Sequence, residues 1–221
     1  MDGNGRWARK RGLPKIAGHR AGAKSVDEIT QAAASSGVKV LTLYAFSTEN
    51  WKRPKEEVNA LFGLLEDYLV KEVSRLNKNN IRLSVIGNIS QLPRSTQDRI
   101  ADAIEATKGN TGMVLNIALN YGSRREIVDA VRAICEDVKR GALRSEDITE
   151  ELFSKHLHTA GLPDPDLLIR TSGEFRISNF LLWQVSYAEL YITEKLWPDF
   201  RKGDFKKALT EYQRRERRFG G

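Results

Sequence analysis

Short apolar runs alternate with longer segments of helical periodicity along the chain. Runs 38–46, 81–87 and 113–119 are almost continuously apolar, which is typical of buried parallel strands. Between them, apolar residues recur every three or four positions from Val58 to Leu76, which predicts a helix from Pro54 to about Asn79. The same reasoning predicts helices at 18–37, 93–108, 124–140, 145–157 and 204–218, strands at 167–170 and 189–192, and an apolar helical turn or two at 180–187.

Strands that alternate with helices indicate an α/β fold. We expect a single domain over residues 1–221, with a mostly parallel central β-sheet flanked by helices. A chain of 221 residues is long enough to bury a substantial core. Its apolar runs are all too short to span a membrane.

Polar clusters follow three of the predicted strands, at 47–53, 120–123 and 170–179. Ligands of open α/β sheets bind beyond the carboxyl ends of the strands. We therefore expect these clusters to face one cleft, together with the polar loop that opens the chain.

The formal net charge of +7 is concentrated at the two ends of the chain. Asp2 is the only acid among the first 24 residues, and residues 201–218 are also strongly basic. This distribution suits an anionic partner, namely nucleic acid, acidic lipid or a polyphosphate. A basic nucleic-acid-binding protein is disfavoured because the aromatic residues lie in apolar runs or beside carboxylates, where they form no stacking surface.

The opening loop has the composition of a phosphate site. Gly3 and Gly5 flank Asn4, a carboxylate precedes the turn and Arg6 follows it. Glycines let the backbone expose its N–H groups, and such a nest can receive a phosphorylated ligand that carries a divalent metal. A surface turn that leads into a solvated basic helix has the same pattern, so the spacing leaves both interpretations open.

Several other chemistries are disfavoured by what the sequence lacks. A single cysteine and three histidines provide no zinc-ligand set, and neither a P-loop motif nor a Gly-x-Ser-x-Gly motif occurs. Cys135 shares a helical face with Ile127, Val131, Ile134 and Val138, so we expect it to pack in the core.

Five blocks of sequence resemble the cis-prenyltransferase family, and especially its members that make undecaprenyl diphosphate. They are 1–8 (MDGNGRWA), 47–54 (STENWKRP), 169–184 (IRTSGEFRISNFLLWQ), 187–191 (YAELY) and 215–221 (RERRFGG). The resemblance implies an enzyme that condenses isopentenyl diphosphate with an allylic diphosphate, usually farnesyl diphosphate, to give a cis-polyprenyl diphosphate. The length of the product, shorter or longer than undecaprenyl, stays open. A catalytically idle family subunit is disfavoured because the charged residues of these blocks are retained.

The resemblance also implies roles for individual residues. Those implied to bind the allylic diphosphate are Gly3, Asn4, Gly5, Arg6, Trp7, Lys15, His19 and Arg53. Those implied to bind isopentenyl diphosphate are Arg170, Arg176, Ser178 and Arg218. Asp2 and Glu189 are the implied carboxylates for Mg²⁺, and Ser47 and Asn50 lie in the loop near the proton-transfer step. Trp7 and Trp51 are expected to flank the site.

Further expectations concern the surroundings of the enzyme. The resemblance implies a homodimer in which Arg218 reaches the partner's site, no nucleic-acid partner, and a product that partitions into the membrane. A cytoplasmic location follows, peripheral at the membrane, with organelle targeting left open because the family's first strand should precede Asp2 and is not seen. The residues expected to wall an apolar tunnel, or else an ordinary core, are Ala45, Leu61, Phe62, Leu65, Leu69, Ile81, Ile86, Met113, Ile117 and Leu119, with Met113 and Leu119 at its floor.

Overall fold

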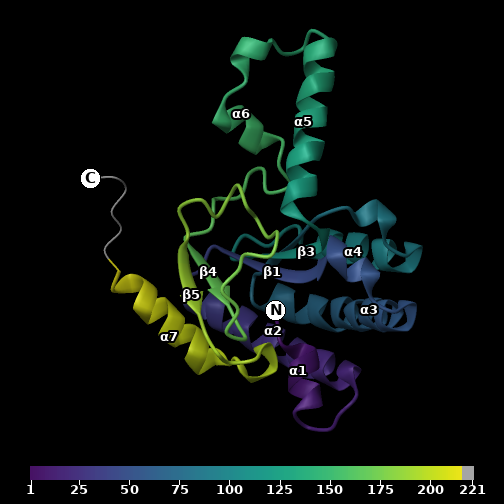
Figure 1. Cartoon of the computed structure of the whole chain (residues 1–221), viewed down its shortest axis with the longest axis vertical. Helices are drawn as coiled ribbons and strands as arrows, with labels where there is room; N and C mark the ends of the chain where they lie inside the picture. Colours follow the sequence, from purple (N-terminus) through teal and green to yellow (C-terminus); the bar gives the residue numbers. More distant parts are fainter. Residues whose placement is uncertain (216–221) are drawn as a thin grey trace.

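The computed structural model describes residues 1–215 (Figure 1). Its helices are α1 (Asn4–Arg9), α2 (Lys15–Ser35), α3 (Lys55–Lys78), α4 (Arg94–Thr107), α5 (Ser123–Lys139), α6 (Glu150–Lys155) and α7 (Lys202–Gln213). Its strands are β1 (Val40–Ser47), β2 (Arg82–Ile86), β3 (Val114–Tyr121), β4 (Leu167–Arg170) and β5 (Glu189–Ile192). Four 3₁₀ turns, η1 (Thr48–Lys52), η2 (Ile89–Gln91), η3 (Ser145–Asp147) and η4 (Trp197–Asp199), complete the described elements.

The larger sheet has the order β1-β3-β2, and both of its strand pairs are parallel. All eight residues of the central strand β3 are buried, which explains why its sequence is apolar apart from Asn116 and Asn120. The register of β1 against β3 shifts between Tyr44 and Ser47, so β1 is irregular at the end that leads into the polar loop. The predicted α/β class and parallel pairing are confirmed.

The strands of the last third pair with each other. β4 and β5 form a separate two-stranded parallel sheet, whereas a single central sheet was expected. The opening residues lie beside the end of β4, since the Asp2 carbonyl oxygen accepts hydrogen bonds from the Trp197 N–H at 2.9 Å and from the hydroxyls of Thr171 and Ser172 at 3.1 and 2.9 Å. These contacts, made by loops and side chains, attach the small sheet to the start of the chain.

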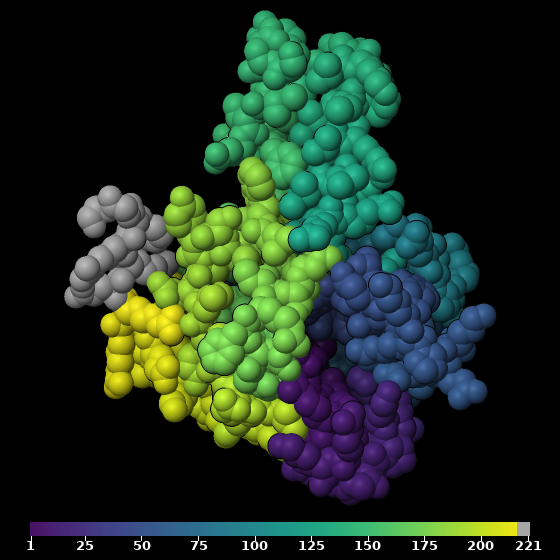
Figure 2. Space-filling model, viewed as in Figure 1, coloured from purple at the N-terminus to yellow at the C-terminus, as the bar shows by residue number. Residues whose placement is uncertain are grey.

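The main core lies between the larger sheet and helices α2, α3 and α4. Ile29, Phe46, Phe62, Leu115 and Phe200 are among its fully or nearly fully buried members. By contrast, α5 and α6 form an arm that projects from the body of the molecule (Figures 1 and 2).

The arm corrects two expectations. Cys135 is exposed rather than packed in the core, and Val131 on the same predicted face is 47 % exposed, because a projecting helix buries only the side that meets the body and α6. The single helix expected at 145–157 is instead η3 followed by α6. The Thr149 hydroxyl caps α6 by accepting the Leu152 N–H at 3.2 Å, so the helix begins there.

Two further boundaries differ near the end of the chain. Residues 180–187 form turns and not a regular helix, and Leu181 within them has a left-handed backbone with φ of 50°. α7 ends at Gln213, so Arg214 and Arg215 are not helical as expected, and residues 216–218 of the helix expected at 204–218 lie beyond the described residues.

Candidate active site

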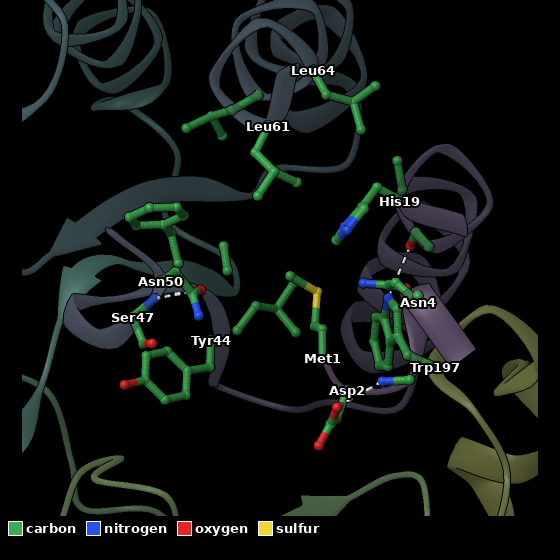
Figure 3. Close-up of a pocket in the computed structure, with 18 of the residues that line it drawn as sticks. Met1, Asp2, Asn4, His19, Tyr44, Ser47, Asn50, Leu61, Leu64 and Trp197 are labelled. Atoms are coloured by element: carbon green, nitrogen blue, oxygen red, sulfur yellow. Dashed lines mark hydrogen bonds between the residues drawn. The ribbon is translucent and has the colours of Figure 1, made fainter. Parts of the chain in front are cut away.

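A cavity of about 850 Å³ opens where the carboxyl ends of β1 and β4 meet α1, α2 and α3 (Figure 3). Of the predicted site residues, it is lined by Asp2, Gly3, Asn4, Gly5, Arg6, Lys15, His19, Ser47, Asn50, Arg53, Arg170 and Ser178. The opening loop, the start of α2, the 47–53 loop and the 170–179 loop therefore share one cavity, as the strand-end argument predicted for the first, third and fourth of them. The 120–123 cluster, expected in the same cleft, does not line this cavity. Asn120, Tyr121 and Gly122 instead line a smaller pocket beside Glu126 and His158.

Asp2 lies at the start of α1, where Gly3 has φ of 100° and allows the tight turn. The Asp2 carboxylate accepts the Gly3 N–H at 2.8 Å and the Arg170 guanidinium at 2.9 Å, with Arg6 at 3.6 Å. Burial raises the pKa of this carboxyl, but the charges of Arg170, the Met1 amino group and Arg6, together with the Gly3 N–H, outweigh that effect and hold the pKa below its usual value. Asp2 is therefore an ionised carboxylate among cations.

Two glycines of α2 bring the opening loop close to that helix. A Cβ atom at Gly18 would lie 2.0 Å from the Asn4 carbonyl oxygen, and one at Gly22 would lie 2.4 Å from the Asn4 side-chain oxygen. Sequence reasoning gave these glycines no role at the site. Their spacing of four residues puts Gly18 and Gly22 on the same face of the helix, and this pattern could have indicated that another segment packs closely there.

On the α2–α3 side of the cavity, Lys15 and Arg53 both pair with Glu57, at 3.1 and 3.2 Å. His19 lies one turn beyond Lys15. Burial, followed by the neighbouring charge of Arg53, lowers the pKa of His19 below its ordinary value, so the imidazole is neutral at pH 7. Glu57 was missed from the sequence, although its position four residues after Arg53, in the first turn of α3, allows an ion pair between them.

On the opposite side, cations from the loop after β4 meet the opening helix. Arg6 pairs with Glu174 at 2.9 Å, and Arg176 pairs with the same carboxylate at 2.5 Å. Arg170 points to Asp2, with 2.9 Å between its guanidinium and the carboxylate. The Arg170 side chain is only 16 % exposed, whereas that of Arg176 is 64 % exposed.

Ser47 and Asn50 hold each other in place. The Asn50 side chain accepts the Ser47 N–H at 3.1 Å, and the Ser47 side chain accepts the Asn50 N–H in return. This reciprocal cap begins η1 directly after β1 and fixes both polar side chains at the cavity wall.

Beyond the charged groups the cavity is apolar. Leu61 and Leu64 of α3 lie across it from Met1 and Tyr44 (Figure 3). The predicted tunnel residues that line it are Ala45, Leu61, Phe62, Leu65, Ile117 and Leu119. Those that do not are Leu69, Ile81, Ile86 and Met113, all of which are buried in the hydrophobic clusters. The expectation that Met113 forms the floor therefore has no support.

Other predicted site residues do not line the cavity. The Trp7 indole N–H donates to Asp199 at 2.7 Å, and Trp51 donates to Asn120 at the same distance. Arg176 lies at the surface beside Glu174. Arg218 lies outside the described residues.

Glu189 is placed at the far end of the small sheet. Its partner in the register is Leu167, whereas Arg170 pairs with Ile192, so Glu189 is three residues, or roughly 10 Å, along the sheet from Arg170. Its carboxylate accepts a hydrogen bond from Arg215 at 2.6 Å. Within residues 1–215, no group of three His, Cys, Asp or Glu side chains could hold a metal ion by itself.

Comparison with known proteins identifies the family. The family model described as putative undecaprenyl diphosphate synthase matches residues 1–220. The chain belongs to this family. Relatives include the isoprenyl transferase of Bacillus subtilis, 56 % identical over all 221 residues and 85 % of the relative's length, and that of Clostridium perfringens, 53 % identical over all of this chain and 87 % of the relative. The chain is accordingly a prenyl transferase, as the five blocks predicted.

Solved structures of the family have the same fold. Lavandulyl diphosphate synthase from Lavandula x intermedia, in complex with dimethylallyl diphosphate, has a TM-score of 0.97 and 42 % identity, over 100 % of this chain and 95 % of that one. A probable undecaprenyl diphosphate synthase from Campylobacter jejuni has a TM-score of 0.80 and 37 % identity, over 91 % and 93 % of the two chains. No helix in the described part of the chain is long and apolar enough to cross a bilayer.

Proposed function

We propose that this family member condenses isopentenyl diphosphate with an allylic diphosphate, with farnesyl diphosphate as the starter, and builds a long cis-polyprenyl diphosphate such as undecaprenyl diphosphate. The observation that carries the proposal is a single cavity with cations on two sides of its entrance and apolar walls beyond them. An allylic diphosphate has the same division, with an anionic head and a hydrocarbon tail.

The allylic diphosphate would lie against the start of α1 and between α2 and α3. The first-turn N–H groups of a helix have no acceptor within it, so those of Asn4, Gly5 and Arg6 are available to phosphate oxygens. Lys15, His19 and Arg53 would add charged or polar donors. The hydrocarbon tail would then lie along Leu61 and its apolar neighbours. Val26, which also lines the cavity, lies eleven positions after Lys15 on α2. At a rise of about 1.5 Å per residue, the wall that α2 provides is roughly 16 Å long.

Mg²⁺ fits beside Asp2. Magnesium is usually bound by one or two carboxylates together with substrate phosphates, and Asp2 offers an ionised carboxylate at the start of the phosphate loop. When bound, the metal would stabilise negative charge on the departing diphosphate. Glu189 does not fit as a second carboxylate of the same chain, because it lies at the far end of β5 and pairs with Arg215.

Isopentenyl diphosphate would bind on the other side, through Arg170, Arg176 and Ser178. The allylic carbon–oxygen bond breaks and its electron pair leaves with the diphosphate. The isopentenyl double bond then attacks the allylic carbon, and a proton is lost to form the new double bond. Ser47 and Asn50 are polar groups that line the cavity, and the family resemblance implies that their loop lies near this step. We therefore assign them to the transfer of the proton.

We further propose a two-fold homodimer in the cytoplasm, peripheral at the membrane that receives the product, with no nucleic-acid partner. Phe175, in the loop after β4, and Tyr187, two residues before β5, are 81 % and 82 % exposed, and we place them at the contact between the subunits. In this assembly Arg218 would complete the partner's isopentenyl site. Mixing Asp2→Ala and Arg218→Ala protomers should then restore up to half the activity per heterodimer, since one of its two sites carries neither change. No recovery despite subunit exchange would contradict it.

The function is tested with radiolabelled isopentenyl diphosphate, farnesyl diphosphate and Mg²⁺. We expect label in a long polyprenyl product whose length is read by chromatography. Purified protein that stays dimeric and folded but incorporates no label would support an idle subunit instead.

A further inference from the structure

Asn179 joins three segments of the site. Its side-chain N–H donates to the Glu49 carboxylate at 2.9 Å, and its side-chain oxygen accepts the Arg124 N–H at 2.8 Å. Its main-chain oxygen accepts the Ser123 N–H at 2.9 Å. One residue therefore connects the loop after β1, the start of α5 and the loop that follows β4.

The backbone around Asn179 is held in a conformation that most residues avoid. Ser178, Asn179 and Leu181 have φ values of 54°, 61° and 50°. Left-handed backbone is unfavourable for residues other than glycine, least so for asparagine, and it persists only where surrounding contacts impose it. The loop from 176 to 181 therefore needs external contacts to keep its shape.

The junction is tightly packed. A Cβ atom at Gly122 would lie 2.6 Å from the Thr48 hydroxyl and 2.8 Å from the Asn179 side-chain nitrogen. Beside it, the Phe180 ring stacks on Tyr44 with centroids 4.5 Å apart, and the Tyr44 hydroxyl donates to the Tyr121 carbonyl oxygen at 3.0 Å.

The partner of Asn179 belongs to the other substrate loop. Glu49 lines the cavity between Ser47 and Asn50. Burial raises the pKa of its carboxyl, but the hydrogen bond from Asn179 and those from its own loop lower the pKa below its usual value. A hydrogen bond to an ionised carboxylate is roughly twice as strong as a neutral one.

We propose that Asn179 is a positioning residue that fixes the 176–181 loop, on the isopentenyl side, to the 47–53 loop, on the allylic side. The proposal rests on the two-sided substrate assignment above. Both ends of the Asn179 amide are bonded to protein, so it acts through the placement of Ser178 and its neighbours. A misplacement of about 1 Å between reacting groups can cost a hundred-fold in rate, which is the effect such a junction would prevent.

The test compares Asn179→Gly with Asn80→Gly. Glycine keeps the left-handed backbone and removes only the side-chain hydrogen bonds. Asn80 is also left-handed, with φ of 53°, and bonds Thr111 through its side chain, but it lies between α3 and β2 and does not line the cavity. We expect Asn179→Gly to lower kcat at least ten-fold while the Kd for farnesyl diphosphate alone changes less than two-fold, and Asn80→Gly to leave kcat within two-fold.

Glu49→Ala completes the experiment. If the two side chains act as one junction, the double variant Asn179→Gly/Glu49→Ala should be no slower than the worse single variant. Separately, Glu49→Ala should speed hydrogen exchange of the Ser123 and Arg124 amides, which donate to Asn179, at least ten-fold. This readout needs no catalysis and so separates this proposal from the proposed function. Unchanged exchange, multiplying kcat effects or a kcat for Asn179→Gly above half of wild type would each overturn it.

Discussion

The two charged sides of the cavity are built in different ways. On the proposed allylic side, Lys15 begins α2, Arg53 lies two residues before the start of α3, and both pair with the carboxylate of Glu57. On the proposed isopentenyl side, Arg176 pairs with Glu174, which also pairs with Arg6 of the opening helix, and most of the groups lie on a loop with left-handed residues. On both sides, one protein carboxylate pairs with two cations. We infer that a substrate diphosphate replaces this carboxylate when it binds, whether the cations lie at the starts of helices or on a loop.

Asp2 stands between the two sides, and its removal should have the largest effect. Asp2→Ala removes the carboxylate proposed to hold Mg²⁺ and the partner of Arg170. We expect kcat to fall at least a hundred-fold, because losing a central electrostatic group of a transition state costs roughly 3 kcal/mol or more. Steady-state kinetics measures this, with circular dichroism to show that the variant is folded. A variant that keeps over a tenth of wild-type turnover contradicts the assignment.

The shared carboxylates provide a finer comparison. If the only effect of Glu57 is to pair with Lys15 and Arg53, Glu57→Gln should lower KM for the allylic substrate by up to about five-fold. An ion pair whose cation is open to solvent, as Lys15 is, contributes at most roughly 1 kcal/mol. Glu174→Gln should do the same for isopentenyl diphosphate. Glu56→Gln, one position away on the exposed face of α3, is the control. A rise in KM would mean that these carboxylates position the cations.

His19 should give the smallest effect, and a pH-dependent one. Its pKa is lowered in the free protein, and a bound diphosphate would favour the imidazolium and raise that pKa. Binding then takes up a proton, so the affinity advantage of wild type over His19→Gln should grow as pH falls from 7.5 to 6. Without ligand, the effect of His19 on the free energy of unfolding has the opposite sign. Because its pKa is lower in the folded than in the unfolded protein, protonation favours the unfolded state, and stability is lost as pH falls below about 6.5. Calorimetry with farnesyl diphosphate checks the first effect, and a constant affinity ratio contradicts it.

The same contrast explains what the sequence could predict. Helices α2 and α3 and strand β3 follow from periodicity and apolar runs, so these elements and six of the ten predicted wall residues of the cavity could be predicted from the sequence. The loop from 176 to 181 could not, because the left-handed backbone at Ser178 and Leu181 depends on tertiary contacts that local propensity does not encode. Likewise, the exposure of Cys135 depends on α5 leaving the body of the molecule.

The family motifs predicted more of the site residues than hydrophobic periodicity did. From the five family blocks, Asp2, Arg53 and Arg170 were expected in one site although they are far apart in the sequence. The structure places all three in one cavity. The blocks did not place Glu189, whose position at the far end of β5 follows from the β4–β5 register. The register between β4 and β5 depends on the tertiary fold, so it could not be predicted from this single sequence.

The most direct test of the two-sided account is a crossed measurement of KM. Arg53→Ala and Arg170→Ala each remove one guanidinium, from opposite sides of the same cavity. With both substrates varied, Arg53→Ala should raise KM for the allylic diphosphate at least ten-fold and that for isopentenyl diphosphate less than three-fold, because a charged hydrogen bond contributes about 1.5–3 kcal/mol. Arg170→Ala should show the reverse. If both variants weaken both substrates equally, the division of the cavity into two diphosphate sites is wrong.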